Sequence, residues 1–325
     1  MQKKESVVSI IGSNVEKAGL LLNDGQLVAI PTETVYGLAA NALDIQAVAG
    51  IFAAKNRPTF DPLIVHVKSL DAVAEYVTEI PEKARELAEA FWPGPLTLLL
   101  PKKSIIPELV TSGLPTVAVR VPRHPLTLAL LQSLEFPLAA PSANPFGYIS
   151  PTTAQHVEQQ LGSKIAYILD GGECRVGIES TIVSFESSTP KVLRLGGLRL
   201  EDIESKIGKV EKSLHSSSNP LAPGMLKSHY APQKPLFLCT KAEMTEPGND
   251  KNVGYLFFDK GHERIEGENC LYLSETGDFL EAAQHLFDYL RKLDASHVQE
   301  IRAEILPEKD LGRAINDRLR RAAAV

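Results

Sequence analysis

The sequence predicts a two-domain α/β protein, in which a large domain with a twisted mixed sheet is followed by a linker and a smaller α/β domain. Helical patterns alternate with short apolar runs through the first part of the chain, as is typical of α/β folds. A polar, turn-rich stretch interrupts this alternation, which then resumes toward the C-terminus. We therefore expect a first domain at 1–207, a linker at 208–235 and a second domain at 236–325.

Capping residues and apolar runs mark the elements of the first domain. Ser13, with Glu16 three residues later, forms a capping-box pattern at the start of the first helix. Asp44 can cap the second helix, and Pro58 follows its end. Apolar residues at helical spacing predict helices at 13–25, 44–54, 125–134 and 153–160, and further helices that start at Ser69 and Pro81. Apolar and β-branched runs predict strands at 27–30, 63–67, 96–100, 116–121, 137–140, 165–169, 178–185 and 191–195.

The second domain repeats the alternation on a smaller scale. The predicted strands fall at 236–239, 253–258 and 270–273, and the predicted helices at 278–293 and 311–324. This region contains neither a G-x-G-x-x-G nor a G-x-x-x-x-G-K-[ST] motif. The sequence therefore predicts no P-loop and no standard dinucleotide fingerprint there.

Composition limits the classes to which the chain can belong. The 325 residues carry 34 Lys and Arg against 40 Asp and Glu, and the net charge of −6 does not favour a nucleic-acid backbone. Three scattered cysteines without a C-x-x-C pair indicate neither a disulfide framework nor a structural zinc site. No apolar run reaches the ~20 residues that cross a bilayer, and no hydrophobic region directly follows the N-terminal Met. We expect a cytoplasmic, reduced protein that does not enter a membrane.

The stretch 31–67 gathers hydroxyls, cations and an imidazole near the ends of predicted elements. Thr32 and Thr34 follow the first strand, at the edge where open α/β sheets bind ligands. Lys55 and Arg57 follow the second helix, where they could complement the helix dipole or hold the phosphates of a nucleotide. His66 lies in an apolar strand and could be an ordinary buried histidine. Together these groups indicate an anion site.

Two more arginines lie in predicted strands. Arg120 occupies an otherwise apolar strand, so its guanidinium needs a carboxylate partner. A neighbouring side chain could supply it, but we favour a carboxylate of the substrate. Arg194 adds a further cation, and Ser142 and Asn144 lie in a turn between prolines that holds them ready for hydrogen bonding, unless they form only an Asx turn.

Part of the linker is expected to dock on the first domain. Residues 222–232 read A-P-G-M-L-K-S-H-Y-A-P, and a pure spacer seldom needs Met, His and Tyr together. We interpret this segment as a lid over the site, with an ordinary interdomain tether as the alternative.

The candidate residues are rich in hydrogen-bond donors and poor in catalytic bases. No Ser-His-Asp order, paired acidic motif or metal cluster stands out in the sequence, and Glu33 alone is a weak signal for a base. Such a set indicates catalysis by positioning and charge stabilisation, which suits phosphoryl and nucleotidyl transfer.

These motifs resemble those of the threonylcarbamoyl-AMP synthase family, whose members contain a YrdC-like domain. The similarity rests on P-T-E-T-V-Y-G-L at 31–38, K-N-R at 55–57, S-A-N at 142–144, G-I-E-S-T-I at 177–182, the segment 222–232 and G-R-A-I-N-D-R at 312–318. It covers nearly the whole chain and is closest to the long, two-domain form of the family. The resemblance implies a YrdC-like twisted mixed sheet followed by a smaller, Rossmann-like domain.

The resemblance also implies a reaction. L-threonine, bicarbonate or carbon dioxide, and ATP would give threonylcarbamoyl-AMP and pyrophosphate, and a downstream transferase would use the intermediate to modify tRNA. A carbamate oxygen would attack the α-phosphorus of ATP, and a dry pocket would protect the labile intermediates from water. Mg2+ is expected with ATP, held mostly by phosphates and water, because the sequence reveals no protein ligand for it.

The resemblance further implies roles for individual residues. The threonine-binding positions are Thr34, His66, Arg120, Ala140 and Ser180, with Arg120 on the carboxylate. The nucleotide-binding positions are Arg57, Asp61, Thr116, Ser142, Asn144, Ser150, Arg194 and Tyr230, and the catalytic residues beside the phosphates are Lys55 and Arg57. Asp61 departs from the family pattern, because relatives often carry a neutral or imidazole side chain there. A carboxylate would repel the triphosphate unless magnesium or Lys55 intervenes.

Two other functions remain open at this level. A YrdC-like domain could bind double-stranded RNA or the ribosome without chemistry, which would need a continuous positive face. Four arginines near the C-terminus are expected on a solvated helix face, with an RNA-facing patch as the alternative: Arg313, Arg318, Arg320 and Arg321. Carbamoyl-phosphate-dependent maturation chemistry uses a related domain, but in longer chains with zinc-finger and acylphosphatase-like parts. The joint presence of Lys55, Arg57, Ser142 and Asn144 favours the synthase.

Overall fold

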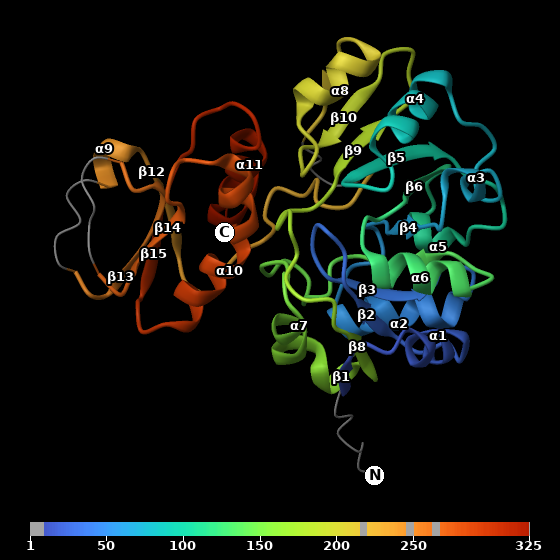
Figure 1. Ribbon diagram of the computed structural model, residues 1–325, viewed down its shortest axis with the longest axis horizontal. Coiled ribbons are helices and arrows are strands. Elements are labelled where there is room, and N and C mark those ends of the chain that lie inside the picture. The colour runs from blue at the N-terminus through green and yellow to red at the C-terminus, as the bar shows by residue number, and fades with distance from the viewer. Residues whose placement is uncertain (1–9, 215–219, 245–249, 262–266, 325) are drawn as a thin grey trace.

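The computed structural model describes residues 10–214, 220–244, 250–261 and 267–324. Two α/β units lie side by side and are joined by the linker (Figure 1). The predicted fold class is therefore confirmed. Residues 215–219 of the expected linker lie outside the described residues. The stretch 1–9, in which no signal peptide was expected, also lies outside them.

The first unit is built on a mixed sheet of 11 strands. The strands are β1 (Ile10–Gly12), β2 (Val28–Ile30), β3 (Gly37–Asn41), β4 (Ile64–His66), β5 (Leu96–Pro101), β6 (Thr116–Arg120), β7 (Leu138–Ala139), β8 (Tyr167–Leu169), β9 (Thr181–Ser184), β10 (Lys191–Arg194) and β11 (Glu211–Lys212). Their order in the sheet is β1-β8-β2-β3-β7-β4-β6-β5-β9-β10-β11. The pairs β4–β6 and β5–β9 are parallel, whereas β2–β3 and β5–β6 are antiparallel, so elements far apart in sequence end at a common site.

Helices and the linker cover the two faces of this sheet. The helices are α1 (Val15–Asn23), α2 (Ile45–Lys55), α3 (Leu70–Val73), α4 (Glu82–Phe91), α5 (Glu108–Thr111), α6 (Pro125–Ser133), α7 (Ala154–Leu161) and α8 (Leu200–Ile207), with a 3-10 turn at Gly162–Lys164. Leu22 of α1 and Leu130 of α6 pack on Ile30 of β2 in one core. A larger core on the opposite face contains Ile51 of α2 and Leu87 of α4. No helix in the described ranges combines the length and the apolar character that a membrane crossing requires.

The second unit is a parallel sheet of four strands in the order β12-β15-β13-β14. The strands are β12 (Leu236–Cys239), β13 (Val253–Asp259), β14 (Cys270–Ser274) and β15 (Glu300–Glu304), and the helices are α9 (Lys241–Met244), α10 (Phe279–Ala295) and α11 (Gly312–Ala323). In Figure 1, α10 and α11 lie on the side of this sheet that faces the first unit.

One local prediction is wrong, and several elements were not predicted, among them β3 and β15. The first helix is capped by Asn14, whose Oδ1 accepts the Lys17 N–H at 2.9 Å, and not by Ser13. Strand β3 was not predicted because glycine and alanine fill most of it, and both are weak strand formers. Strand β15 was not predicted because its sequence, E-I-R-A-E, carries three charges, although it lies between β12 and β13.

The second unit docks on loops of the first through α10. Arg291 donates from Nε to the Ser150 carbonyl at 3.2 Å and from Nη2 to Gln160 Oε1 at 3.0 Å. Gly177 has a φ of +77°, and a Cβ there would meet the backbone of Ala283 and Gln284 in α10. Only glycine fits such a close approach between two backbones.

Candidate active site

A cavity of about 520 Å³, its open mouth included, lies between the first sheet and the linker. The lining residues are mostly polar, and they come from strand ends, from the loops that follow, and from the linker: Thr32, Thr34, Val35, Gly37, Arg57, Ile64, His66, Arg120, Ala140, Pro141, Ser142, Glu179, Ser180, Arg194, Pro223, Gly224, His229 and Tyr230.

The structure brings most of the predicted site residues to this cavity. The lining includes Thr34, Arg57, His66, Arg120, Ala140, Ser142, Ser180, Arg194 and Tyr230. The other predicted residues are buried but are not lining residues: Lys55, Asp61, Thr116, Asn144 and Ser150, of which Ser150 bonds to the lining residue Glu179. Sheet pairing explains the convergence, because His66 and Arg120 are register partners in β4 and β6.

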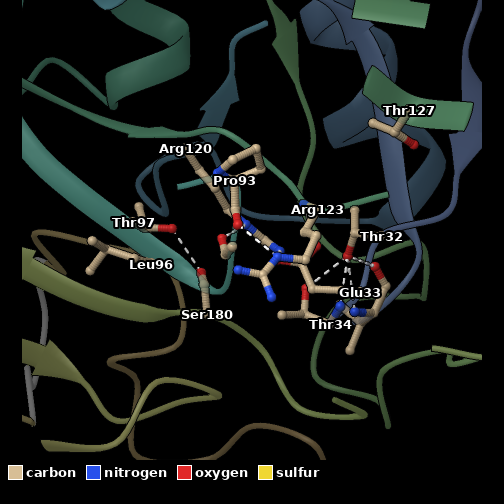
Figure 2. Close-up of polar contacts among 12 residues, drawn as sticks. Thr32, Glu33, Thr34, Pro93, Leu96, Thr97, Arg120, Arg123, Thr127 and Ser180 are labelled. Carbon is tan, nitrogen blue, oxygen red and sulfur yellow. Dashed lines mark hydrogen bonds and ion pairs between the residues drawn. The ribbon is translucent and has the colours of Figure 1, made fainter. Parts of the chain in front are cut away.

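Two pairs of hydroxyls flank the strand that carries Arg120 (Figure 2). Pro31 ends β2, and Thr32 Oγ1 then donates to the Val35 carbonyl at 2.7 Å, which closes a turn. This turn places Thr32 Oγ1 and Thr34 Oγ1 2.8 Å apart. On the other side, Ser180 Oγ lies 2.7 Å from Thr97 Oγ1.

Arg120 has a carboxylate partner within the protein. Its Nη2 lies 2.8 Å from Glu33 Oε1, and the other carboxylate oxygen accepts the Arg123 N–H at 2.9 Å. A neighbouring side chain, Glu33, therefore supplies a carboxylate partner for Arg120. This was the less favoured of the two alternatives that the sequence allowed. Arg120 also lines the cavity, so its contact with a substrate carboxylate stays a prediction.

Arg57 and Asp61, four positions apart in the loop after α2, form a buried ion pair. Arg57 Nη2 lies 2.9 Å from Asp61 Oδ2 and donates to the Pro62 carbonyl at 2.8 Å. Burial raises the pKa of Asp61, and the nearby Arg57 opposes this rise. Asp61 is fully buried and is not one of the lining residues, and Arg57 contacts its carboxylate.

Lys55 holds the backbone of the S-A-N turn. Its Nζ donates to the Ser142 carbonyl at 2.5 Å and to the Asn144 carbonyl. Burial, reinforced by Arg57, lowers the pKa of Lys55 well below its usual value. Asn144 Nδ2 donates to the Pro145 and Tyr148 carbonyls, each at 2.8 Å, so this side chain also stabilises the turn. The expected catalytic role of Lys55 stays a prediction.

Arg194 brings to the cavity a positive charge that forms no direct ion pair with the described residues, although Glu179 acts on it electrostatically. Within the described part of the chain its guanidinium donates to neutral oxygens, which are the Ser180 carbonyl at 3.0 Å, Ser180 Oγ at 3.0 Å and the Pro223 carbonyl at 3.1 Å. The ion pairs of the described residues include Arg57 and Arg120 but none with Arg194. A buried cation in this state favours an anion from outside the protein.

The linker forms one wall of the cavity. Met225 packs on Ile64 and Leu99 of the sheet, and Tyr230 is 1% exposed. The Tyr230 ring stacks on Phe287 of α10 with 5.6 Å between ring centroids. The docked segment agrees with a lid, and its opening and closing stay a prediction.

Two lining residues of chemical interest were missed in the sequence. Glu179 lies inside the G-I-E-S-T-I motif, and its Oε1 accepts the Ser150 hydroxyl at 2.6 Å. His229 directly precedes Tyr230, and burial lowers its pKa well below the usual value, with Arg57 and Lys55 adding to the effect. Glu179 lies in the motif at 177–182 and His229 in the segment 222–232, and both stretches resemble the family. This resemblance was the signal that could have identified the two residues.

The predicted solvated face of the C-terminal arginines is wrong for two of the four. Arg318 is 0% and Arg321 2% exposed, and both pair with Asp317. Arg313 and Arg320 pair with acidic side chains nearer the surface. Local sequence shows charge spacing but not which side of a helix faces a neighbouring domain.

Acidification should destabilise the protein through His66. Burial, with a further contribution from Arg120, lowers the pKa of His66 to about 3. Since its unfolded pKa is about 6.5, the unfolded chain binds the extra proton as the pH falls below that value, and stability is lost. At pH 5 this histidine should cost about 2 kcal/mol of the free energy of unfolding relative to pH 7.

Urea unfolding at pH 7 and pH 5 checks this expectation. His66→Asn should remove about 2 kcal/mol of the difference between the two pH values, while His229 keeps a contribution of the same sign. His297→Asn is the matched control, because His297 is exposed. An unchanged pH difference in His66→Asn would show that His66 is not held neutral in the fold.

The residues around the cavity offer no ready set of metal ligands. Within the described ranges, no group of three or more His, Cys, Asp or Glu side chains could hold a metal ion. The three carboxylates nearest the cavity, Glu33, Asp61 and Glu179, each pair with an arginine. These three carboxylates are therefore already engaged by arginines.

Comparison with known proteins shows the family to which the chain belongs. Residues 20–196 match the Sua5, YciO and YrdC family model, described as telomere recombination, and residues 198–324 match the threonylcarbamoyl-AMP synthase C-terminal domain. The threonylcarbamoyl-AMP synthase of Pyrococcus abyssi is 44% identical over 322 residues, which cover 93% of this chain and 92% of the relative. That of Bacillus subtilis is 40% identical over 330 residues, which cover 95% of this chain and 92% of the relative. The crystal structure of P. abyssi Sua5 complexed with L-threonine is similar with a TM-score of 0.89 at 40% identity, over 97% of each chain. The chain therefore belongs to the threonylcarbamoyl-AMP synthase family.

Proposed function

We propose that the protein is an L-threonylcarbamoyladenylate synthase, which converts L-threonine, bicarbonate or carbon dioxide, and ATP into threonylcarbamoyl-AMP and pyrophosphate. The observation that supports it most directly is Arg194, a buried cation without a direct ion pair among the described residues, in a cavity that Arg57 also lines. Phosphate oxygens would satisfy this charge, because guanidinium groups bind them with paired hydrogen bonds.

Threonine is assigned to the end of the cavity nearest the sheet. Arg120 binds its carboxylate, and Glu33 keeps the guanidinium in place. His66 stays neutral at physiological pH and offers ring nitrogens to polar groups of the amino acid. The other members of this threonine site are Thr34, Ala140 and Ser180.

The nucleotide is assigned to the end formed by the S-A-N turn and the linker. Its contacts are Arg57, Ser142, Arg194 and Tyr230, all of which line the cavity. Lys55 and Asn144 fix the turn, and the remaining proposed nucleotide-binding residues are Asp61, Thr116 and Ser150. Two ends with different chemistry would orient a carbamate oxygen toward the α-phosphorus, so the rate comes from orientation rather than from a protein base.

Magnesium is proposed to arrive with ATP and to be held by phosphates and water, because the nearby carboxylates are engaged by arginines. The adenylate then passes to a downstream transferase that modifies tRNA. The cytoplasm, where ATP and tRNA are both available, is the proposed compartment.

Pyrophosphate release from ATP tests this function. With magnesium and bicarbonate present, we expect release that depends on L-threonine and stops when EDTA removes the magnesium. Release at the same rate without threonine would contradict the proposal, and so would no release under any of these conditions.

The alternative of a non-enzymatic module for double-stranded RNA gains no support from the site. Arg318 and Arg321, two of the four cations that suggested an RNA-facing patch, are buried. The other two are paired with Glu201 and Glu308. The four C-terminal arginines, which were the main candidates for a continuous positive face, therefore do not supply one.

A further inference from the structure

A buried arginine of the second unit reaches the wall of the cavity. Arg318 of α11 is 0% exposed, and its Nε lies 3.0 Å from Glu179 Oε2. The two residues are 139 positions apart in the sequence. Glu179 itself lines the cavity, so one ion pair connects the second unit to the proposed nucleotide site.

Glu179 also contacts Ser150, a predicted nucleotide-binding residue. Its second oxygen, Oε1, accepts the Ser150 hydroxyl at 2.6 Å. The carboxylate therefore has one oxygen fixed by a guanidinium and the other fixing a hydroxyl. Without the guanidinium, the Glu179 carboxylate would be buried and unpaired, and it would repel phosphate.

The same arginine also supports the linker. Its guanidinium carbon lies 5.4 Å from the centroid of the Tyr230 ring, a cation–π arrangement. Its Nη1 donates to the Leu195 carbonyl, which directly follows Arg194. Arg318 of the second unit thus helps to fix three residues of the proposed nucleotide site: Ser150, Arg194 and Tyr230.

We propose that Arg318 is a positioning residue of the nucleotide site, which acts on Ser150 through Glu179 and on the linker through Tyr230. The second unit is then a part of the active site rather than an appended domain. This inference rests on the proposed function. It predicts a larger effect on ATP than on threonine, because the described contacts of Arg318 are with Glu179, Leu195, Tyr230 and Asp317 and not with Arg120.

The test uses the full chain and measures ATP affinity by calorimetry, the KM values for ATP and threonine, and the melting temperature. Arg318→Met should weaken ATP binding by about 10- to 100-fold, the usual effect of losing a hydrogen-bonded charge, and should leave the KM for threonine within about twofold. Arg318→Lys should fall between Met and the native protein, since it keeps the charge but not the planar fork. Arg320→Met, an exposed position on the same helix, is the control and should match the native protein.

A double variant separates positioning from folding. Arg318→Met combined with Glu179→Gln leaves no unpaired buried charge, so its melting temperature should recover toward the native value. Its ATP affinity should stay low, because the amide is no longer held by a guanidinium. Ser150→Ala should weaken ATP binding in the native background and add little in the Arg318→Met background.

The outcomes distinguish this inference from the proposed function. Recovery of ATP affinity together with the melting temperature would reduce Arg318 to a structural role and overturn the inference. An equal rise in both KM values would also overturn it. If the native protein binds ATP but releases no threonine-dependent pyrophosphate, the synthase reaction fails while calorimetry still decides the role of Arg318. Absence of ATP binding by the native protein would overturn both.

Discussion

Replacement of Arg57 by alanine is expected to reduce threonine-dependent pyrophosphate release by at least about 100-fold. The guanidinium lines the cavity at the proposed phosphate site. Its removal also leaves Asp61, which is 0% exposed, as an unpaired buried carboxylate close to that site. Attraction for phosphate is therefore lost and repulsion is added. Steady-state pyrophosphate release at varied ATP concentration is the measurement.

Two further variants define the cause of this loss. Arg57→Ala with Asp61→Asn should regain thermal stability without regaining activity, since the unpaired charge is gone but the phosphate contact is still missing. Arg302→Ala removes an exposed arginine that pairs with Glu300 in the second unit, and it should keep native activity. Native activity in Arg57→Ala would contradict the assignment of Arg57 to the nucleotide.

Deletion of residues 208–325 is expected to leave a folded first domain with turnover reduced by at least about 100-fold. The deletion removes four residues of the cavity wall, Pro223, Gly224, His229 and Tyr230. It also removes the arginines that hold the Ser150 and Arg194 segments from the second unit. Circular dichroism reports whether the truncated chain folds, and pyrophosphate release reports its activity. Full activity in the truncated chain would remove the case for Tyr230 as a nucleotide contact.

An intact-chain variant tests the same docking without deletion. Gly177→Ala places a Cβ against the backbone of Ala283 and Gln284, so α10 must move away, and turnover should fall by about tenfold. Gly208→Ala is the matched control, because Gly208 has a similar φ of +78° but no atom near its Cβ position. Gly208→Ala therefore introduces backbone strain without a steric clash. The turnover of this variant should stay close to native. Equal losses in the two variants would show that strain, rather than separation of the units, lowers activity.

The sequence could predict much of the fold because local patterns determine local structure. Asp44 caps α2 as predicted, accepting the Gln46 and Ala47 N–H groups, and Pro31 follows β2. Alternation of helices and strands was sufficient to predict two α/β units. Prediction failed at β3 and β15, where residue types unfavourable for strands are held in place by pairing with neighbours.

The sequence by itself determined which residue types are available for the chemistry. The motifs shared with the family indicated which positions along the chain carry the site residues. Only the tertiary structure decided the partner of each charge. Glu33 pairs with Arg120, Asp61 with Arg57, and Glu179 with Arg318, while Arg194 forms no such ion pair with the described residues. The physical reason is that a buried charge is stabilised by whatever the fold brings within a few ångströms of it, and parallel sheet pairing and domain docking bring together residues that are distant in sequence.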